Sequence, residues 1–159
     1  MERIYLDTNA FYFFFFNHEE YSEGVKKIFG RIHRGELMGV TSVVTLEELA
    51  YVSLMRLIEK RYNKHPAQVL RENKKAIAES SENLKEVFDV IFSLKNIDIA
   101  DLDRDTASII PRIMEDYLLL PQDSIHLQTM RQTNCEHILS TDKDFDGIYG
   151  ITRIRPEEA

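Results

Sequence analysis

Short apolar runs and longer amphipathic stretches alternate along this chain. Apolar residues dominate five short segments that predict strands, at 3–6, 37–41, 97–100, 137–140 and 151–156. Between them, apolar residues recur at helical spacing, at 19–34, 42–61, 82–94 and from the cap region 101–105 to about 117. Strands separated by helical segments favour right-handed parallel crossovers. The pattern therefore predicts an α/β fold, a three-layer α/β/α sandwich around a central parallel sheet of about five strands.

Two prolines mark less regular helical segments. Pro66 interrupts the pattern, and residues 67–80 beyond it are more polar than anything before them, so we expect a pair of surface helices there. Pro111 lies inside the helix predicted to end near Tyr117, which it can kink or restart. A further helix is expected over 124–131.

Six consecutive aromatic residues follow the first strand, from Phe11 to Phe16. On a helix they would cover every side, and a single helix face cannot bury them all. Part of the run is therefore expected to meet the core, a second subunit or a partner. We expect a homodimer. The alternatives are stacking on RNA bases and complete burial among neighbouring helices.

Length and composition indicate one globular domain spanning residues 1–159. The chain has 43% hydrophobic and 30% charged residues, which suffices for a sizeable core. The single cysteine, Cys135, excludes an internal disulfide and suits a reducing compartment. No stretch approaches the roughly 20 apolar residues of a membrane span. We therefore expect a cytoplasmic protein with no membrane partner.

The formal net charge of −7 means that a nucleic acid would have to be met by a local basic patch. The densest basic segment is 60–65, with Arg71, Lys74 and Lys75 beyond it. We expect this segment to help hold an RNA backbone. The alternative is an ordinary solvated helix face.

Four acids stand where a parallel sheet would bring them together. Asp7 ends the first strand, Glu48 lies in the helix after the second, Asp123 lies at a helix start and Asp142 follows the fourth strand. Ligand sites in open α/β sheets lie beyond the carboxyl ends of the strands. Carboxylates gathered there repel one another and need a cation to stay ionised. Oxygen ligands favour Mg²⁺ or Mn²⁺, which support attack of water on a phosphodiester.

Each acid also has a simpler interpretation. Asp7 or Asp123 can cap a helix, Asp142 can belong to a turn, and Glu48 can lie on a solvated helix face. On the predicted helix, Glu47 falls nearer the apolar arc and Glu48 falls at its edge. Helix geometry alone therefore does not decide which of the two acids faces the site. These roles can account for any one of the acids, but they account much less well for all four together.

Residues 142–147 also match the first half of a calcium-binding EF-hand loop. The final ligand of such a loop should be a Glu, and that position is Arg153. The flanking segments are predicted strands, whereas an EF-hand needs two helices. We therefore reject the calcium-loop interpretation.

Four motifs in this order resemble the PIN domains, metal-dependent ribonucleases that include VapC-type toxins. They are LDTN at 6–9, TSVVTLEELAYV at 41–52, LPQDSIHL at 120–127 and STDKDFD at 140–146. The resemblance implies that the catalytic acids and metal ligands are Asp7, Glu48, Asp123 and Asp142. It further implies supporting polar roles for Thr8, Asn9, Ser140 and Thr141.

The same resemblance implies a Mg²⁺- or Mn²⁺-dependent endoribonuclease that hydrolyses single-stranded RNA, and the toxin of a toxin–antitoxin pair with an antitoxin protein as partner. A non-catalytic PIN-like module that binds RNA or protein is the alternative. Retention of all four acids argues against it. A third alternative is a metal-dependent phosphatase that acts on small molecules. A phosphatase with an aspartyl nucleophile would usually carry Asp-x-Asp at the first strand, and here the second position is Asn9.

Overall fold

The computed structural model describes residues 1–159 and divides them into two compact units. The first unit comprises Met1–Leu46 and Lys95–Ala159, and the second comprises Glu47–Leu94. The expected single-domain organisation stays a prediction.

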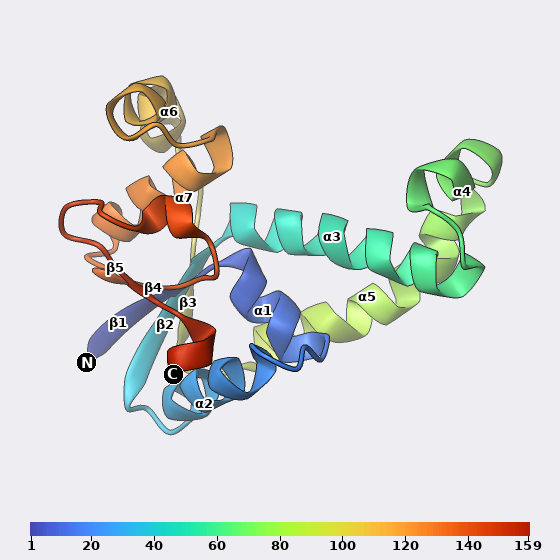
Figure 1. Cartoon of the computed structure of the whole chain (residues 1–159), viewed down its shortest axis with the longest axis horizontal. Coiled ribbons are helices and arrows are strands. Elements are labelled where there is room, and N and C mark those ends of the chain that lie inside the picture. The colour runs from blue at the N-terminus through green and yellow to red at the C-terminus, as the bar shows by residue number, and fades with distance from the viewer. The chain divides into compact units, whose positions relative to one another are not determined.

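A five-stranded parallel sheet forms the centre of the first unit (Figure 1). Its strands are β1 (Glu2–Leu6), β2 (Leu37–Ser42), β3 (Ile97–Ala100), β4 (His137–Leu139) and β5 (Thr152–Ile154). Their spatial order is β3-β2-β1-β4-β5, so β1 is the central strand. The predicted strands are confirmed, with the last one shorter than expected.

Helices cover both faces of this sheet. Its helices are α1 (Thr8–Phe15), α2 (Ser22–His33), α6 (Arg104–Tyr117) and α7 (Pro121–Gln132), with short 3-10 helices η1 (Lys143–Phe145) and η2 (Pro156–Glu158). Figure 1 shows α1 and α2 on one face and α6 and α7 on the other. The predicted three-layer α/β/α sandwich is confirmed.

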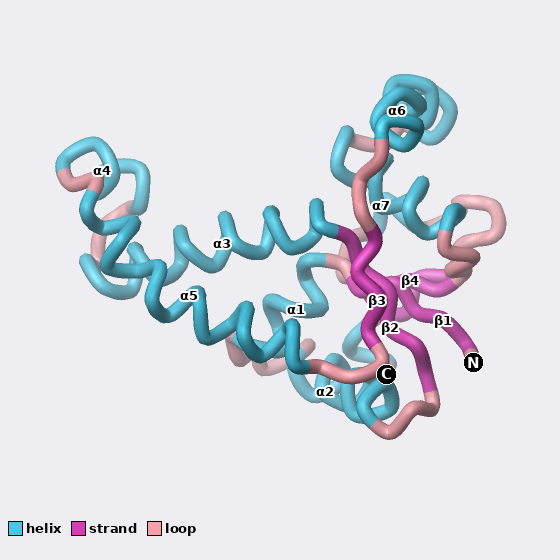
Figure 2. Tube along the Cα trace, turned by 180° about the vertical axis from the view of Figure 1, so that it is seen from behind, coloured by secondary structure: helices cyan, strands magenta, loops and turns pink.

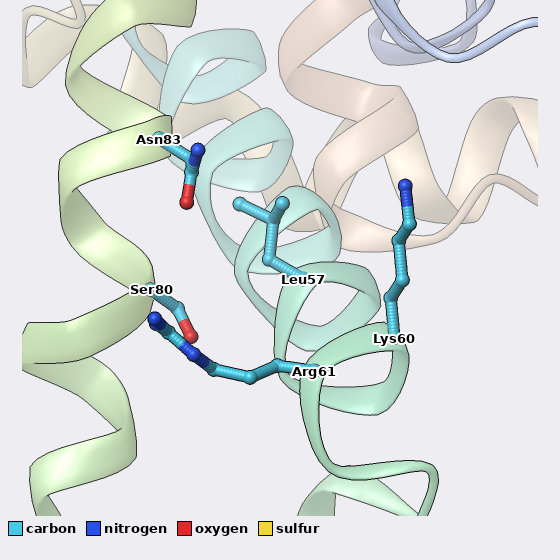
Figure 3. Close-up of a pocket in the computed structure, with 5 residues that line it drawn as sticks. All are labelled: Leu57, Lys60, Arg61, Ser80 and Asn83. Atoms are coloured by element: carbon cyan, nitrogen blue, oxygen red, sulfur yellow. The ribbon is translucent and has the colours of Figure 1, made fainter.

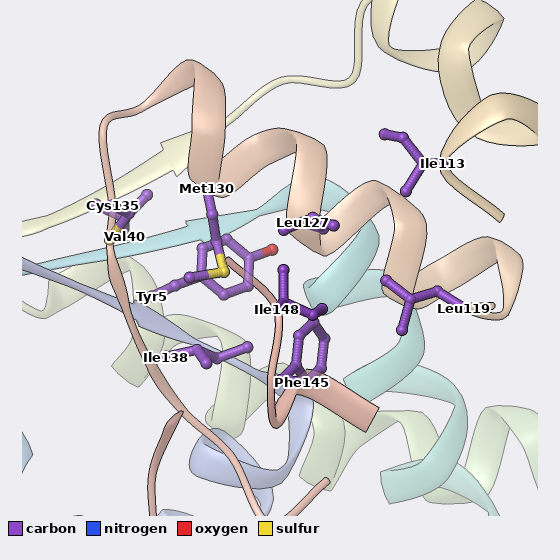
Figure 4. Packing of buried hydrophobic residues seen from close by; sticks show 10 residues of the cluster. All are labelled: Tyr5, Val40, Ile113, Leu119, Leu127, Met130, Cys135, Ile138, Phe145 and Ile148. Atoms are coloured by element: carbon purple, nitrogen blue, oxygen red, sulfur yellow. The ribbon is translucent and has the colours of Figure 1, made fainter. Parts of the chain in front are cut away.

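The two faces of the sheet are filled by alternating residues of the buried strands. Tyr5 belongs to the core cluster beneath α6 and α7, which Figure 4 shows with Leu127, Met130 and Phe145 around it. On the opposite face, a Cβ added to Gly39 would lie 3.1 Å from a methyl of Leu6 and 3.2 Å from one of Ile32 in α2. A glycine at this position therefore lets α2 approach β2 closely.

The aromatic run forms α1 and its end. Phe11 is fully buried, and the next five rings are partly buried. Phe11 and Phe14 both pack on Phe29 of α2, with ring centroids 5.5 Å and 4.4 Å apart. Part of the run therefore meets the core, which is one of the surfaces expected for it. The homodimer stays a prediction.

The second unit consists of helices. They are α3 (Val43–Tyr62), which begins in the first unit, α4 (Pro66–Glu72) and α5 (Lys75–Ser93). Figure 2 shows α4 at the turn between α3 and α5. Ile58, Val69 and Ala76, one from each helix, form a small apolar core. None of the chain's helices is both long and apolar enough to span a membrane.

The helix boundaries between 67 and 94 differ from the prediction. Two helices follow Pro66, as expected, and they divide where α4 ends at Glu72 and the side chain of Asn73 accepts the N–H of Lys75 at 3.0 Å. The helix expected at 82–94 is the second half of α5. Ala76 and Ser80 lie four residues apart and are both buried, so α5 has an inward stripe that its polar composition concealed.

Candidate functional site

Asp7 lies where β1 ends and α1 begins. The residue is only 5% exposed, and its Oδ1 accepts the N–H of Thr8 at 2.7 Å. Thr8 is buried as well, and Asn9 is partly buried. The expected capping role is therefore present, but a carboxylate has about four acceptor positions, so capping is compatible with a second role.

Ser140 joins two of the predicted acids. Leu6 of β1 pairs with Leu139 of β4, so the next residues, Asp7 and Ser140, leave the sheet at the same edge. The Ser140 hydroxyl donates to Asp7 Oδ2 at 2.6 Å, and its Oγ accepts the N–H of Asp142 at 2.9 Å. Thr141, between them, is partly buried. The hydroxyl thus positions Asp7 and Asp142 together.

Asp123 lies in the first turn of α7, which begins at Pro121 and not at Ser124 as predicted. Proline suits the first helical position because the N–H that it lacks would have no partner there. Burial raises the pKa of Asp123 to about 6, and the negative charges of Asp142, Asp7 and Asp144 add to the effect. The ionised form is therefore disfavoured without a cation.

Three carboxylates lie together at this edge. Asp123, Asp142 and Asp144 can each present an oxygen so that all three oxygens lie within 4.8 Å of one another. Asp142 also caps η1 by accepting the N–H of Asp144 at 2.9 Å. Hard oxygen donors at this separation fit Mg²⁺ or Mn²⁺, and a divalent ion would relieve the repulsion that adds to the effect of burial on the pKa of Asp123. Asp144 was not among the predicted residues, although it lies in the quoted motif.

His126 is a second residue that the sequence analysis did not select. It is 1% exposed; its Nδ1 lies 2.9 Å from the Tyr5 hydroxyl and its Nε2 lies 3.7 Å from Asp7 Oδ1. The Tyr5 hydroxyl also bonds to Ser42 and Thr45, each at 3.1 Å. Asp123 and His126 are three residues apart and so share one face of α7. This spacing of three residues was the feature of the sequence that could have identified His126.

Glu48 lies in α3 within the second unit. Glu47 is exposed whereas Glu48 is partly buried, the reverse of what the apolar arc suggested. Helix geometry alone left the choice between them open, because both lie near the edge of the arc. The place of Glu48 at a metal site stays a prediction.

Arg153 of β5 binds the loop after β4, which carries Asp142 and Asp144. Its side chain is 4% exposed and donates to both carboxylate oxygens of Asp146 at 2.8 Å. It also donates to the Ser140 carbonyl at 3.3 Å. This pairing holds the pKa of Asp146 below its usual value. The EF-hand interpretation is excluded, because strands β4 and β5 flank the segment where two helices would be needed.

The raised pKa of Asp123 predicts a pH-dependent effect of Asp123→Asn on stability. The wild-type folded state binds a proton up to about pH 6, whereas the unfolded state releases it near 3.8, so ionisation of Asp123 destabilises the metal-free fold at higher pH. At about pH 8, Asp123→Asn should raise the free energy of unfolding by about 1 kcal/mol, after allowance for solvent screening. The gain should shrink below about pH 6 and vanish below about pH 4.

Urea unfolding of both proteins in EDTA across this pH range measures the difference. A variant less stable than wild type at the higher pH would contradict the prediction, as would a difference that does not change with pH.

The comparisons with known proteins agree with this architecture. Residues 4–151 match the model of the PIN domain family. No curated protein matches the chain.

Several solved structures share the fold. Crystalline VapBC2 from Rickettsia felis, bound to a promoter DNA fragment, is 14% identical with a TM-score of 0.61, covering 96% of this chain and 98% of that one. A toxin–antitoxin complex from Klebsiella pneumoniae is 19% identical with a TM-score of 0.57, covering 98% and 99%. VapC20 from Mycobacterium tuberculosis, a sarcin-ricin loop cleaving toxin, is 13% identical with a TM-score of 0.62, covering 96% and 99%. At these identities the structures show the fold alone.

Proposed function

The chain belongs to the PIN domain family, and from this we propose that it is a Mg²⁺- or Mn²⁺-dependent endoribonuclease that hydrolyses phosphodiester bonds of single-stranded RNA. The observation that carries the proposal is the gathering of Asp123, Asp142 and Asp144 beside Asp7 and Ser140 at the carboxyl edge of the sheet. Repelling acids at one edge favour a cation site over a purely structural role.

In this proposal Asp7, Asp123 and Asp142 are the catalytic acids and metal ligands, with Glu48 completing the set. A bound divalent ion supplies charge neutralisation at phosphate oxygens and a more acidic water. Ser140 keeps the carboxylate of Asp7 in place through its 2.6 Å hydrogen bond. Thr8, Asn9 and Thr141 are supporting polar groups around them.

We further propose that the protein is a toxin neutralised by an antitoxin protein. The support is that structures of similar fold include VapBC2 and a toxin–antitoxin complex. RNA is proposed as the substrate partly because VapC20 is described as cleaving the sarcin-ricin loop. A homodimer built on the aromatic run of α1 remains part of the proposal.

The direct test is incubation of the purified protein with a mixture of RNAs. We expect fragments with Mg²⁺ or Mn²⁺, no fragments in EDTA, and recovery when excess Mn²⁺ is added back, because the acids need the cation to act. An Asp123→Asn preparation purified in the same way controls for contaminating nuclease. Undiminished cleavage in EDTA would contradict the metal dependence, and RNA binding with no cleavage under any condition would favour a binding module.

A further inference from the structure

A pocket of about 340 Å³ lies between α3 and α5 within the second unit (Figure 3). Its walls are Leu57, Lys60, Arg61, Ser80 and Asn83. Apart from Leu57, every lining side chain offers a hydrogen-bond donor, and none is acidic. The pocket therefore favours a ligand that carries acceptor oxygens and negative charge.

The hydroxyl of Ser80 is a polar group of the pocket that lacks a hydrogen-bond partner. Its side chain is 1% exposed, and its hydroxyl oxygen has no hydrogen-bond partner. Most buried polar atoms in folded proteins are paired, because an unpaired one costs free energy. An acceptor oxygen placed in the pocket would give this hydroxyl the partner that the free protein lacks.

The two positively charged side chains of the pocket, Arg61 and Lys60, differ in how they are held. Arg61 donates to the backbone carbonyl of Glu79, which holds its guanidinium across to α5 beside Ser80, as Figure 3 shows. Its other N–H groups leave donor capacity. Lys60 is exposed and has no ion-pair partner. The carboxylate of the nearby Glu79 accepts the hydroxyl of Tyr62 and does not line the pocket.

We propose that this pocket binds a phosphate group of the RNA backbone, through Lys60, Arg61, Ser80 and Asn83. The inference rests on the proposed function for its choice of RNA. A guanidinium, an ammonium and neutral donors around one space suit a tetrahedral oxyanion. With a net charge of −7, the protein must meet RNA through local basic sites, and Lys60 and Arg61 of this pocket belong to the densest basic segment of the chain.

The first arm of the test uses inorganic phosphate and thermal unfolding, in EDTA and against chloride of equal ionic strength. Phosphate should raise the unfolding midpoint of the wild type. Ser80→Ala should leave the midpoint in chloride unchanged or higher, because an unpaired hydroxyl is removed, and should shrink the phosphate shift. Lys60→Ala should also shrink it, and Lys85→Ala, an exposed charge on α5 outside this pocket, should not.

The second arm measures binding of a short oligouridine in EDTA, where cleavage does not interfere. Lys60→Ala should weaken binding about fivefold and lower the slope of log K against log salt by about 0.7, as expected for one lost phosphate contact. Lys85→Ala should change neither.

The outcomes separate the claims. Equal phosphate shifts in wild type, Ser80→Ala and Lys60→Ala would overturn the pocket as a phosphate site. Phosphate binding that Lys60→Ala removes, with RNA affinity and salt slope unchanged, would overturn RNA as the source of the phosphate. A wild type that shows both effects but never cleaves RNA with Mn²⁺ would refute the nuclease proposal and leave the pocket standing.

Discussion

Asp123→Asn should lower RNA cleavage by at least about a hundredfold, because it removes a proposed metal ligand and a charge on which the site depends. Asn is close in shape to Asp, so the first turn of α7 should be kept. The loss should therefore occur in a folded protein. Initial cleavage rates under saturating Mn²⁺, with circular dichroism spectra of both proteins, measure it.

A matched control is Asp105→Asn, which changes an exposed Asp in the first turn of α6 in the same way. It should cleave RNA at the wild-type rate. Asp7→Asn is expected to behave like Asp123→Asn. If both site variants kept full activity, with contaminating nuclease excluded, the assignment of the catalytic acids would be wrong.

Arg153→Ala should lower the midpoint of thermal unfolding by about 5 °C, because a nearly buried guanidinium loses a bidentate pair with the half-exposed Asp146 and its bond to a backbone carbonyl. The substitution removes the two bonds to Asp146 and the bond to the Ser140 carbonyl. Since Ser140 positions Asp7 and Asp142, cleavage should also fall. Differential scanning calorimetry in EDTA measures the midpoint without any contribution from a bound ion.

Arg155→Ala is the control for this prediction. Arg155 pairs with Glu158 at 2.9 Å, but both side chains are about half exposed or more, and exposed pairs contribute little. Its midpoint should stay close to that of the wild type. Equal midpoints for Arg153→Ala and Arg155→Ala would show that the Asp146–Arg153 pair does not brace the loop.

The sequence was sufficient for the fold class and the family. The periods of apolar residues located every strand, because alternation and helical spacing are local properties of the chain. The PIN resemblance, first drawn from four motifs, is confirmed by the family match over residues 4–151. The helix boundaries near Asn73 and Pro121 differ from the prediction. The bond from Lys75 N–H to the Asn73 side chain and the inward stripe of α5 decide the first, and at the second α7 begins with Pro121 in its first turn.

The sequence also identified three acids that the structure brings to one edge of the sheet. Asp7 and Asp142 could be placed from strand ends alone, because neighbouring parallel strands leave the sheet on the same side. Asp123 was selected from its place at a helix start and from the motif around it. The role of all three as ligands remains a proposal, as does that of Glu48.

Only the tertiary structure decided which polar groups support those acids. The Ser140 hydroxyl meets Asp7 across 133 positions of chain, and His126 meets Tyr5 across 121. The burial of Ser80 likewise depends on packing that its polar neighbours in the sequence do not indicate. A periodic pattern records which side of an element faces inward, whereas these contacts depend on which distant residue lies opposite, and that is set when the elements pack together.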